Sequence, residues 1–299
     1  MKLVTYTTAG DTRVGALLDD RMVVDLQRAS GGKLPLSMLA LLDAGPEAIV
    51  VAKGVVEAAR AAGAAGGSHT GVIISLDAPG TRLEAPVPRP GKVLAIGLNY
   101  RDHAEESGQE IPKHPVVFAK ASTCITGPGM PVHRPKVSGA LDWEGELCFV
   151  VGTKARHVDA ADAAQYVAGY MIGNDVSVRD WQFHSPTWMM GKSFDTHGPT
   201  GPWLVTRDEI DVANLDVKTF VNGELKQSSN TKHLIFDVGA IFAYLTAAFT
   251  LEPGDIVFTG TPAGVGIARK PPQFMKAGDV VRVEISGLGV LENSVIDEP

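Results

Sequence analysis

The segment Pro86–Gly91, with the sequence PVPRPG, limits how this 299-residue chain can fold. Its three prolines hold the backbone in an extended course, because proline fixes φ and has no N–H for a helix or a sheet interior. The segment is therefore predicted to be a linker. We expect a small N-terminal domain at residues 1–86 and a larger domain at residues 92–299.

Before the linker, the pattern of apolar residues predicts a small α+β unit. Three β-prone runs separated by turn residues are typical of an antiparallel meander. Apolar residues then recur at helical spacing, and Gly45-Pro46 would divide two helices. The expected elements are strands at 2–7, 13–18, 22–26 and 71–76, helices within 35–63, and a loop at 61–67.

After the linker, short apolar runs with few helical stretches predict an α+β, β-rich fold. The turn sequences at 253–255 and 277–279 each precede a run rich in Val and Ile, as turns between strands do. We expect a barrel-like or rolled sheet with helices packed outside it. Strands are expected within 93–100, 115–121, 145–152, 201–206, 217–223, 255–260 and 279–296, and helices within 159–168 and 234–250.

Composition excludes several classes of function. The net charge is -7 and basic residues form no run, so nucleic acid is not expected as a partner. The sequence contains neither a signal peptide nor a stretch approaching the roughly 18 apolar residues of a membrane span. Cys124 and Cys148 are too far apart for a CxxC pair, which predicts buried free thiols. We expect a cytoplasmic protein without membrane contact.

The sequence DWEGEL at residues 142–147 is the most informative segment for chemistry. In a strand, Glu144 and Glu146 would point to the same face, roughly 6–7 Å apart, and could converge on one hard cation. On spacing alone, a solvent-facing strand edge explains the two glutamates equally well. Asp142 would share their face, either as a loop residue or as a carboxylate beside the ligands.

A third carboxylate, Asp175, ends an otherwise apolar run and would be costly to bury unpaired. Three oxygen ligands without a thiolate favour Mg²⁺, Mn²⁺ or Ca²⁺ over a structural zinc. Arg179 and Gln182 follow within one to two helical turns and could hold an anionic substrate beside the metal. Pairing of Arg179 with Asp180 or Asp175 as a structural ion pair is the alternative.

His103 and Glu106 follow a predicted strand and stand at i and i+3. If a helix begins there, the carboxylate can orient the imidazole and raise its basicity, which would make a general-base pair. A solvated helix face gives the same spacing.

Two glycine-containing segments are poor candidates for nucleotide sites. The GKS at 191–193 lacks the glycine of a phosphate-binding loop, because Pro186 stands at that position. The segment TGTPAGVG at 259–266 follows a predicted strand, yet no clear helix follows it. A loop that offers backbone N–H groups to a carboxylate fits this segment better.

Taken in order, five motifs resemble those of the fumarylacetoacetate hydrolase superfamily, in particular its shorter bacterial members. The resemblance covers roughly residues 92–296. The motifs are GxNYxxHxxE at 97–106, DxEGEL at 142–147, GxxxxNDxxxRDxQ at 169–182, GKSFD at 191–195 and FTGTPAGVG at 258–266.

The resemblance implies a rolled, β-rich catalytic domain with a small N-terminal domain, assembled as a homodimer. Residues 93–97 contain no carboxylate, so the fourth protein ligand of some larger members is not expected here. The implied roles are metal binding, usually of Mg²⁺ or Mn²⁺, for Glu144, Glu146 and Asp175; catalysis for His103, Glu106 and Lys192; and substrate binding for Arg179, Gln182, Gly260 and Thr261.

The function expected from the resemblance is metal-dependent hydrolysis of a C–C bond in an acylpyruvate-like 2-oxo acid, of the fumarylacetoacetate or fumarylpyruvate type, in aromatic compound catabolism. His103, held by Glu106, would activate a water, and Lys192 would stabilise the developing negative charge. A lid at about 107–115 would close on the substrate's far end.

Other reactions use the same enolate-stabilising site, and fold analogy does not select among them. The alternatives are oxaloacetate decarboxylase, 2-hydroxyhepta-2,4-diene-1,7-dioate isomerase and 2-oxo acid dehydratase. A Schiff-base lyase that uses Lys192 is a further option. An alternative of another class is a non-catalytic, metal-dependent binding protein.

Overall fold

The computed structural model describes residues 1–64, 71–106 and 108–299. Its N-terminal part contains the predicted antiparallel meander, because β1 pairs with β2 and β2 with β3. Asp25 and Ser37 accept hydrogen bonds from the first turns of α1 and α2 and thereby fix where these helices begin. The elements are β1 (Lys2–Thr8), β2 (Asp11–Leu17), β3 (Met22–Asp25), α1 (Leu26–Ala29), α2 (Met38–Asp43), α3 (Gly45–Ala64), β4 (Ile73–Ser75) and β5 (Arg82–Leu83).

The predicted break at Gly45 is confirmed, since α2 ends before it and α3 begins at it, with φ of +80° at the glycine. The loop expected at 61–67 is wrong over 61–64, where α3 continues to Ala64. Alanine has the highest helix propensity, so an Ala-rich stretch extends a helix that has already formed. Residues 65–67 of that expectation lie outside the described residues.

The remainder of the chain contains more strand than helix, as predicted. The long elements are β6 (Val93–Gly97), α4 (Arg101–Glu106), β7 (Val116–Lys120), β11 (Gly145–Val151), β12 (Val167–Asn174), β14 (Gly198–Thr206), β15 (Asp216–Val221), β16 (Glu224–Asn230), α7 (Val238–Ala248), β18 (Val280–Ile285) and β19 (Gly289–Asp297). The short strands and α-helices are β8 (Ile125–Thr126), β9 (Val132–Arg134), β10 (Leu141–Asp142), β13 (Ser177–Val178), α5 (Arg179–Gln182), α6 (Met189–Lys192) and β17 (Ile256–Phe258). The 3-10 turns are η1 (Ser122–Cys124), η2 (Ala160–Tyr166), η3 (Arg207–Glu209), η4 (Val212–Asn214) and η5 (Thr231–His233).

The helix expected at 159–168 is confirmed only in part, because residues Ala160–Tyr166 form the 3-10 helix η2 rather than an α-helix. At Val167 the chain enters β12, a central strand of the large sheet. Because β12 is covered on both faces, its sequence is continuously apolar and lacks the alternation that marks a half-buried strand. The helix expected at 234–250 is confirmed as α7.

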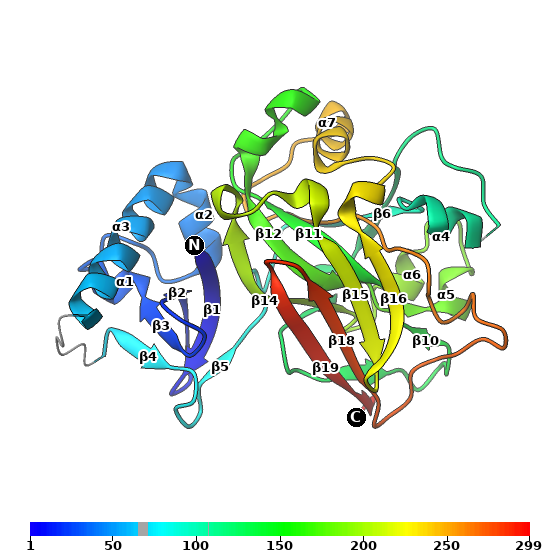
Figure 1. Ribbon diagram of the computed structural model, residues 1–299, viewed down its shortest axis with the longest axis horizontal. Coiled ribbons are helices and arrows are strands. Elements are labelled where there is room, and N and C mark those ends of the chain that lie inside the picture. The colour runs from blue at the N-terminus through cyan, green and yellow to red at the C-terminus, as the bar shows by residue number, and fades with distance from the viewer. Residues whose placement is uncertain (65–70, 107) are drawn as a thin grey trace.

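One large open sheet, in the order β4-β3-β2-β1-β14-β12-β11-β17-β6-β7, organises the molecule. Its end strands β4 and β7 do not meet, so the described residues form no closed barrel. A second sheet, in the order β16-β15-β18-β19-β9, packs across β11, β12 and β14, as Figure 1 shows.

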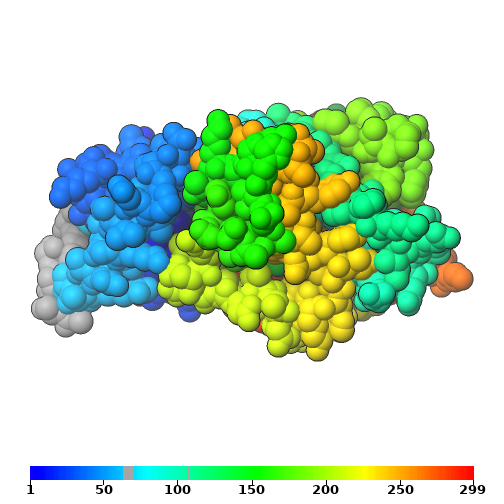
Figure 2. Space-filling view, turned by 90° about the horizontal axis from the view of Figure 1, so that it is seen from above, coloured from blue at the N-terminus to red at the C-terminus, as the bar shows by residue number. Residues whose placement is uncertain are grey.

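Pairing of β1 with β14 joins the N-terminal strands to the large sheet, with Leu3 opposite Leu204. The N-terminal elements nevertheless lie at one end of the molecule in both views, blue in Figure 1 and Figure 2. The domain boundary between residues 86 and 92 stays a prediction.

Two hydrophobic cores cover the two faces of the large sheet. Leu147, Phe149 and Val151 of β11 face the second sheet and α7, while Cys148 and Val150 face the core shared with the N-terminal helices. Helix α7 packs against η2, and the two lie side by side in Figure 2. Burial on both faces makes β11 a rigid base for the carboxylates at its start. Among the described residues, no helix is long and apolar enough to cross a membrane.

Candidate active site

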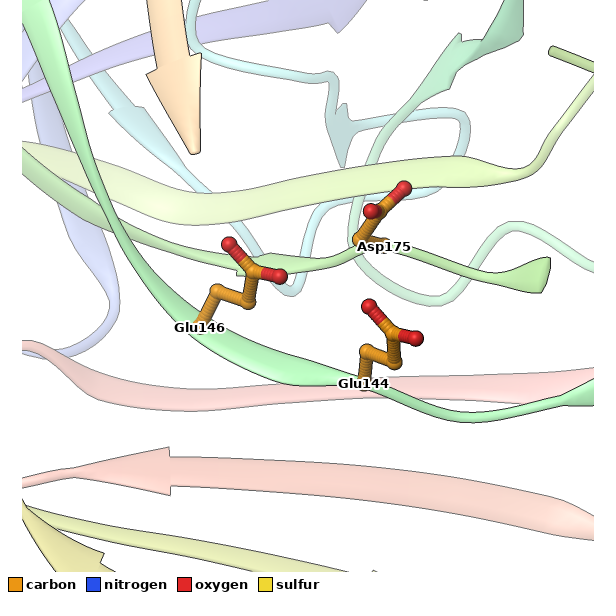
Figure 3. A group of neighbouring side chains, drawn as sticks. All are labelled: Glu144, Glu146 and Asp175. Atoms are coloured by element: carbon orange, nitrogen blue, oxygen red, sulfur yellow. The ribbon is translucent and has the colours of Figure 1, made fainter. Parts of the chain in front are cut away.

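Three buried carboxylates meet where β11 begins and β12 ends. The antiparallel register places Gly145 opposite Asn174, which brings Glu144 and Glu146 beside Asp175. One oxygen from each residue lies within 4.8 Å of the others, and Figure 3 shows the carboxyl groups gathered around one space. Glu144 and Glu146 are only 5% and 2% exposed, so the alternative of a solvent-facing strand edge is wrong.

Two lysines and one arginine offset part of this negative charge. Lys192 Nζ lies 2.7 Å from Glu144 Oε2 and 2.8 Å from Asp175 Oδ2. Lys120 Nζ lies 2.5 Å from Asp175 Oδ1 and also donates to the Lys192 carbonyl. Burial opposes the ionisation of Glu144, but Lys192 and Arg179 outweigh it and lower the pKa of Glu144 to about 2. Burial likewise opposes the charge of Lys120, yet Asp175 and neighbouring groups raise the pKa of Lys120.

Glu146 has a different environment. Its Oε2 accepts a hydrogen bond from the Gly260 N–H at 2.7 Å, but no cationic side chain of the described residues pairs with it. Burial, followed by repulsion from Asp175 and Glu144, raises the pKa of Glu146 well above its usual range. In the metal-free cluster Glu146 therefore favours its protonated, neutral form, because no cationic side chain is placed to stabilise its charge.

The donor set fits a hard divalent cation. Carboxylate oxygens are the ligands that Mg²⁺, Mn²⁺ and Ca²⁺ prefer, and the 4.8 Å spread of the three oxygens suits one ion with metal–oxygen distances of roughly 2.0–2.6 Å. Three protein ligands would leave coordination positions for water or a chelating substrate. A cation held there would be the positive partner that Glu146 lacks and would favour its ionised form.

Arg179 links the carboxylates to the surrounding cavity. Its Nε donates to Asp142 Oδ2 at 2.7 Å, and its Nη1 lies 2.7 Å from Glu144 Oε1 and donates to Gln182 Oε1 at 2.9 Å. The alternative that Arg179 pairs with Asp180 or Asp175 is therefore wrong. Arg179 Nη2 is buried without a partner among the described residues, so the guanidinium keeps an unused donor next to the cavity that Arg179 lines.

His103 and Glu106 both lie on α4, as predicted. Their Nδ1 and Oε2 atoms are 3.6 Å apart, which is an ion-pair distance but too long for a hydrogen bond. The Gly264 N–H instead donates to both Glu106 oxygens, at 3.1 and 2.9 Å. Burial opposes ionisation of Glu106, but His103 and the Gly264 N–H outweigh it and hold the pKa of Glu106 below its usual range.

The loop after β17 donates backbone N–H groups to carboxylates, but these belong to the protein. Besides Gly260 and Gly264, Gly266 and Ile267 donate to Asp142 at 2.7 and 2.9 Å. Asp142 is thus neither exposed nor one of the three grouped carboxylates. By accepting hydrogen bonds from both, Asp142 holds this loop next to Arg179.

Thr261 is held by other polar groups in the same loop. Its hydroxyl donates to the Gly145 carbonyl at 3.0 Å and accepts from Gln227 Nε2 at 2.8 Å. Substrate binding by Gly260 and Thr261 stays a prediction, and the loop would have to exchange these partners to achieve it.

A cavity of about 520 Å³ opens beside the carboxylates. Gln109, in the segment predicted to be a lid, also lines it, while residue 107 of that segment lies outside the described residues. Glu146, Asp175 and Gly260 are not among the described residues that line it. The predicted site residues that line the cavity are His103, Glu106, Glu144, Arg179, Gln182, Lys192 and Thr261.

Reasoning from sequence missed Lys120, Phe118 and Trp188. Lys120 is fully buried at the end of β7, and Phe118 and Trp188 line the cavity. A single lysine within the apolar run 115–121 was the one available signal, because such a lysine must find a buried anion.

The fold and site together define an α+β protein with a buried acidic cluster whose spacing fits a cation, next to a cavity lined by a histidine and an arginine. Residues 92–296 match the family model described as fumarylacetoacetate (FAA) hydrolase C-terminal. The chain belongs to the fumarylacetoacetate hydrolase superfamily.

Relatives with different named activities share this fold. Over 302 residues the chain is 40% identical to a mitochondrial oxaloacetate tautomerase of Xenopus laevis, covering 99% of this chain and 90% of that protein. A fumarylacetoacetate hydrolase structure from Exiguobacterium antarcticum is 34% identical with a TM-score of 0.81, covering 100% of both chains. A 2-hydroxyhepta-2,4-diene-1,7-dioate isomerase structure from Mycobacterium marinum is 32% identical with a TM-score of 0.76, covering 100% of this chain and 99% of that chain.

Proposed function

We propose that the protein is a divalent-metal-dependent enzyme that enolises small 2-oxo acids, with keto–enol tautomerisation or double-bond isomerisation as its reaction. The observation that carries the proposal is that Glu144 and His103 line one cavity, with Arg179 beside them. Enolisation needs three things in one place: stabilisation of an enolate oxygen, a group that moves a proton, and an anchor for the carboxylate. Relatives named as a tautomerase and an isomerase support this reaction class.

Glu144, Glu146 and Asp175 would hold the cation, which supplies charge stabilisation to the carboxylate and 2-oxo oxygens when it is bound. Arg179 lines the cavity and would bind the substrate carboxylate. Its Nη2 is the nitrogen without a partner among the described residues, and the guanidinium would have to shift to present this buried atom to the substrate.

His103 would remove the proton from the carbon next to the 2-oxo group and return it at the position the product requires. Its Nδ1 lies 3.6 Å from Glu106 Oε2, so the carboxylate would orient the imidazole during this transfer. Lys192, between Glu144 and Asp175, would keep positive charge close to the developing enolate.

Hydrolysis of a C–C bond in an acylpyruvate is the second candidate. The pairing of His103 with Glu106 favours it, because the same pair that moves a proton from carbon can activate a water. The similarity to the Exiguobacterium antarcticum hydrolase supports this candidate.

The metal and the assembly also remain proposals. We retain Mg²⁺ or Mn²⁺ as the metal, with Ca²⁺ as a further option, and a homodimer as the assembly, all from the resemblance. A role in aromatic compound catabolism and a cytoplasmic location likewise remain predictions, and the Xenopus laevis relative is named as mitochondrial.

A substrate panel separates the two reactions. Oxaloacetate enol and acetylpyruvate are supplied with Mg²⁺ or Mn²⁺, and again after EDTA, while enol absorbance and pyruvate release are followed together. Faster loss of oxaloacetate enol without pyruvate supports the tautomerase. Pyruvate release from acetylpyruvate moves the assignment to hydrolase, and pyruvate release from oxaloacetate moves it to decarboxylase.

A further inference from the structure

Part of the cavity lining is apolar and includes two residues with strained backbone. Leu98, Phe118, Phe183 and Trp188 line the cavity, and their side chains are apolar apart from the indole N–H of Trp188. Leu98 and Trp188 have φ angles of +54° and +59°. Bulky residues rarely adopt this left-handed conformation, and such strain clusters where a side chain must be aimed at a ligand.

Trp188 lies directly on the end of strand β6. A Cβ atom built on Gly97 would stand 2.3 Å from Trp188 Cζ3, so only glycine leaves room for the indole there. Phe118 meets the indole edge-on, with ring centroids 5.5 Å apart and planes at 69°. A turn with hydrogen bonds from Trp188 N to Ser185 O and from Met189 N to Thr187 O fixes this placement.

The side chains along the cavity change from charged, at the carboxylates, to aromatic, at Phe118 and Trp188. Lys192 Nζ contacts Glu144 and Asp175 and lies 5.3 Å from the centre of the Phe118 ring. Phe118 in turn contacts Trp188. A 2-oxo acid whose oxygens lie at the carboxylate end would therefore extend its far end across Phe118 to the indole.

We propose that Trp188 is a specificity-determining residue whose indole contacts the part of the 2-oxo acid farthest from its carboxylate and favours an apolar tail there. The inference rests on the proposed function, because it takes the carboxylate end of the cavity as the position of the 2-oxo head. It adds a preferred substrate class: 2-oxo acids with an aliphatic or aromatic extension.

Oxamate and N-butyloxamate test this inference without turnover. Both carry the carboxylate and adjacent carbonyl of a 2-oxo acid, and they differ only in the apolar tail. Their Kd values are measured by calorimetry with Mg²⁺ for the full chain, Trp188→Ala and Trp181→Ala. Trp181 is the matched control, since it packs on Phe194 and His184 and is not among the described residues that line the cavity.

N-butyloxamate should bind the unmodified protein about tenfold more tightly than oxamate. Each methylene that is fully removed from water lowers Kd roughly fourfold, but the indole covers only one side of the butyl tail, so the total gain is smaller than for full burial. Trp188→Ala should reduce this ratio to within twofold and leave the oxamate Kd within twofold. Trp181→Ala should keep the tenfold ratio. Trp188→Gly is a second variant that suits the left-handed backbone and keeps the test valid if the alanine variant folds poorly.

A tenfold ratio that persists in Trp188→Ala and Trp188→Gly would overturn the inference, as would equal binding of the two probes by the unmodified protein. In either case oxamate still binds, so the proposed function survives. Failure of oxamate itself to bind in the presence of Mg²⁺ would remove the proposed function and this inference together.

Discussion

Replacing Glu146 by Gln should remove metal-dependent stabilisation of the protein without destabilising the metal-free form. Glu146 is 2% exposed and has no cationic partner among the described side chains, whereas Gln keeps its shape and its hydrogen bond with the Gly260 N–H. In the metal-free protein the substitution replaces a carboxyl group whose ionisation is opposed by burial and by Asp175 and Glu144. Its free energy of unfolding should therefore stay equal or increase.

The size of the metal effect follows from mass action. A cation present at about 100 times its Kd adds about 2.7 kcal/mol to the free energy of unfolding. An unfolding entropy of about 2.1 cal/mol/K per residue gives about 0.63 kcal/mol/K for 299 residues, so Tm should rise by about 4 °C. Loss of one of three ligands should reduce this rise to below about 1 °C.

Thermal unfolding followed by circular dichroism measures the stability of the metal-free protein in EDTA and the rise in Tm with Mg²⁺ or Mn²⁺. Glu57→Gln, at an exposed position of α3, is the matched control and should keep the full rise. A variant at Glu146 that keeps the rise would show that the three carboxylates do not hold the cation. If Glu146→Gln instead lowered the free energy of unfolding by several kcal/mol in EDTA, a charged Glu146 would already be stabilised by other groups in the metal-free protein.

Three further predictions concern residues around the site. His103→Ala should lower kcat by about 100-fold or more while the metal-induced rise in Tm stays unchanged, and normal turnover would exclude His103 as the proton-transfer group. Lys120→Met should lower the free energy of unfolding by about 3–5 kcal/mol in urea titrations, because it leaves Asp175 buried beside one fewer cation; a loss below about 1 kcal/mol would contradict this. Burial lowers the pKa of His197 from 6.5 to about 3, so between these values the unfolded chain binds more protons and the free energy of unfolding falls as pH falls. Between pH 7 and pH 5 this should remove about 2 kcal/mol, and His197→Gln should lose that dependence if the reasoning is correct.

Local spacing was enough to predict part of the site. Glu144 and Glu146 converge because side chains two apart in a strand share a face, and His103 and Glu106 meet because α4 is one short helical stretch. The predicted meander and α7 follow from equally local patterns.

Contacts between residues far apart in the sequence could not be predicted from local spacing. Lys120 meets Asp175 across 55 positions, and the signal in its own segment is one lysine among apolar residues. Strand β12 was missed because burial on both faces removes the alternation that identifies strands. The position of Trp188 depends on a left-handed backbone angle and on the absence of a side chain at Gly97.

The carboxylate-binding loop shows a different limit. Its glycines correctly indicated backbone N–H groups that bind carboxylates, but the sequence could not tell whether these belong to a substrate or to the protein. In the structure the carboxylates that accept these hydrogen bonds belong to Glu146, Glu106 and Asp142, which lie far from the loop in sequence.

Exchange of the hydrogens next to the carbonyl of a 2-oxo acid tests the central claim most directly. Pyruvate in D₂O is followed by proton NMR with the protein and Mg²⁺ or Mn²⁺, and the same measurement is repeated with EDTA and with His103→Ala. If the site enolises 2-oxo acids, the methyl signal should disappear at a rate well above the metal-only control. EDTA should abolish this exchange, and the variant should reduce its rate about 100-fold or more. Exchange no faster than the metal-only control, for both pyruvate and oxaloacetate, would contradict enolisation at this site.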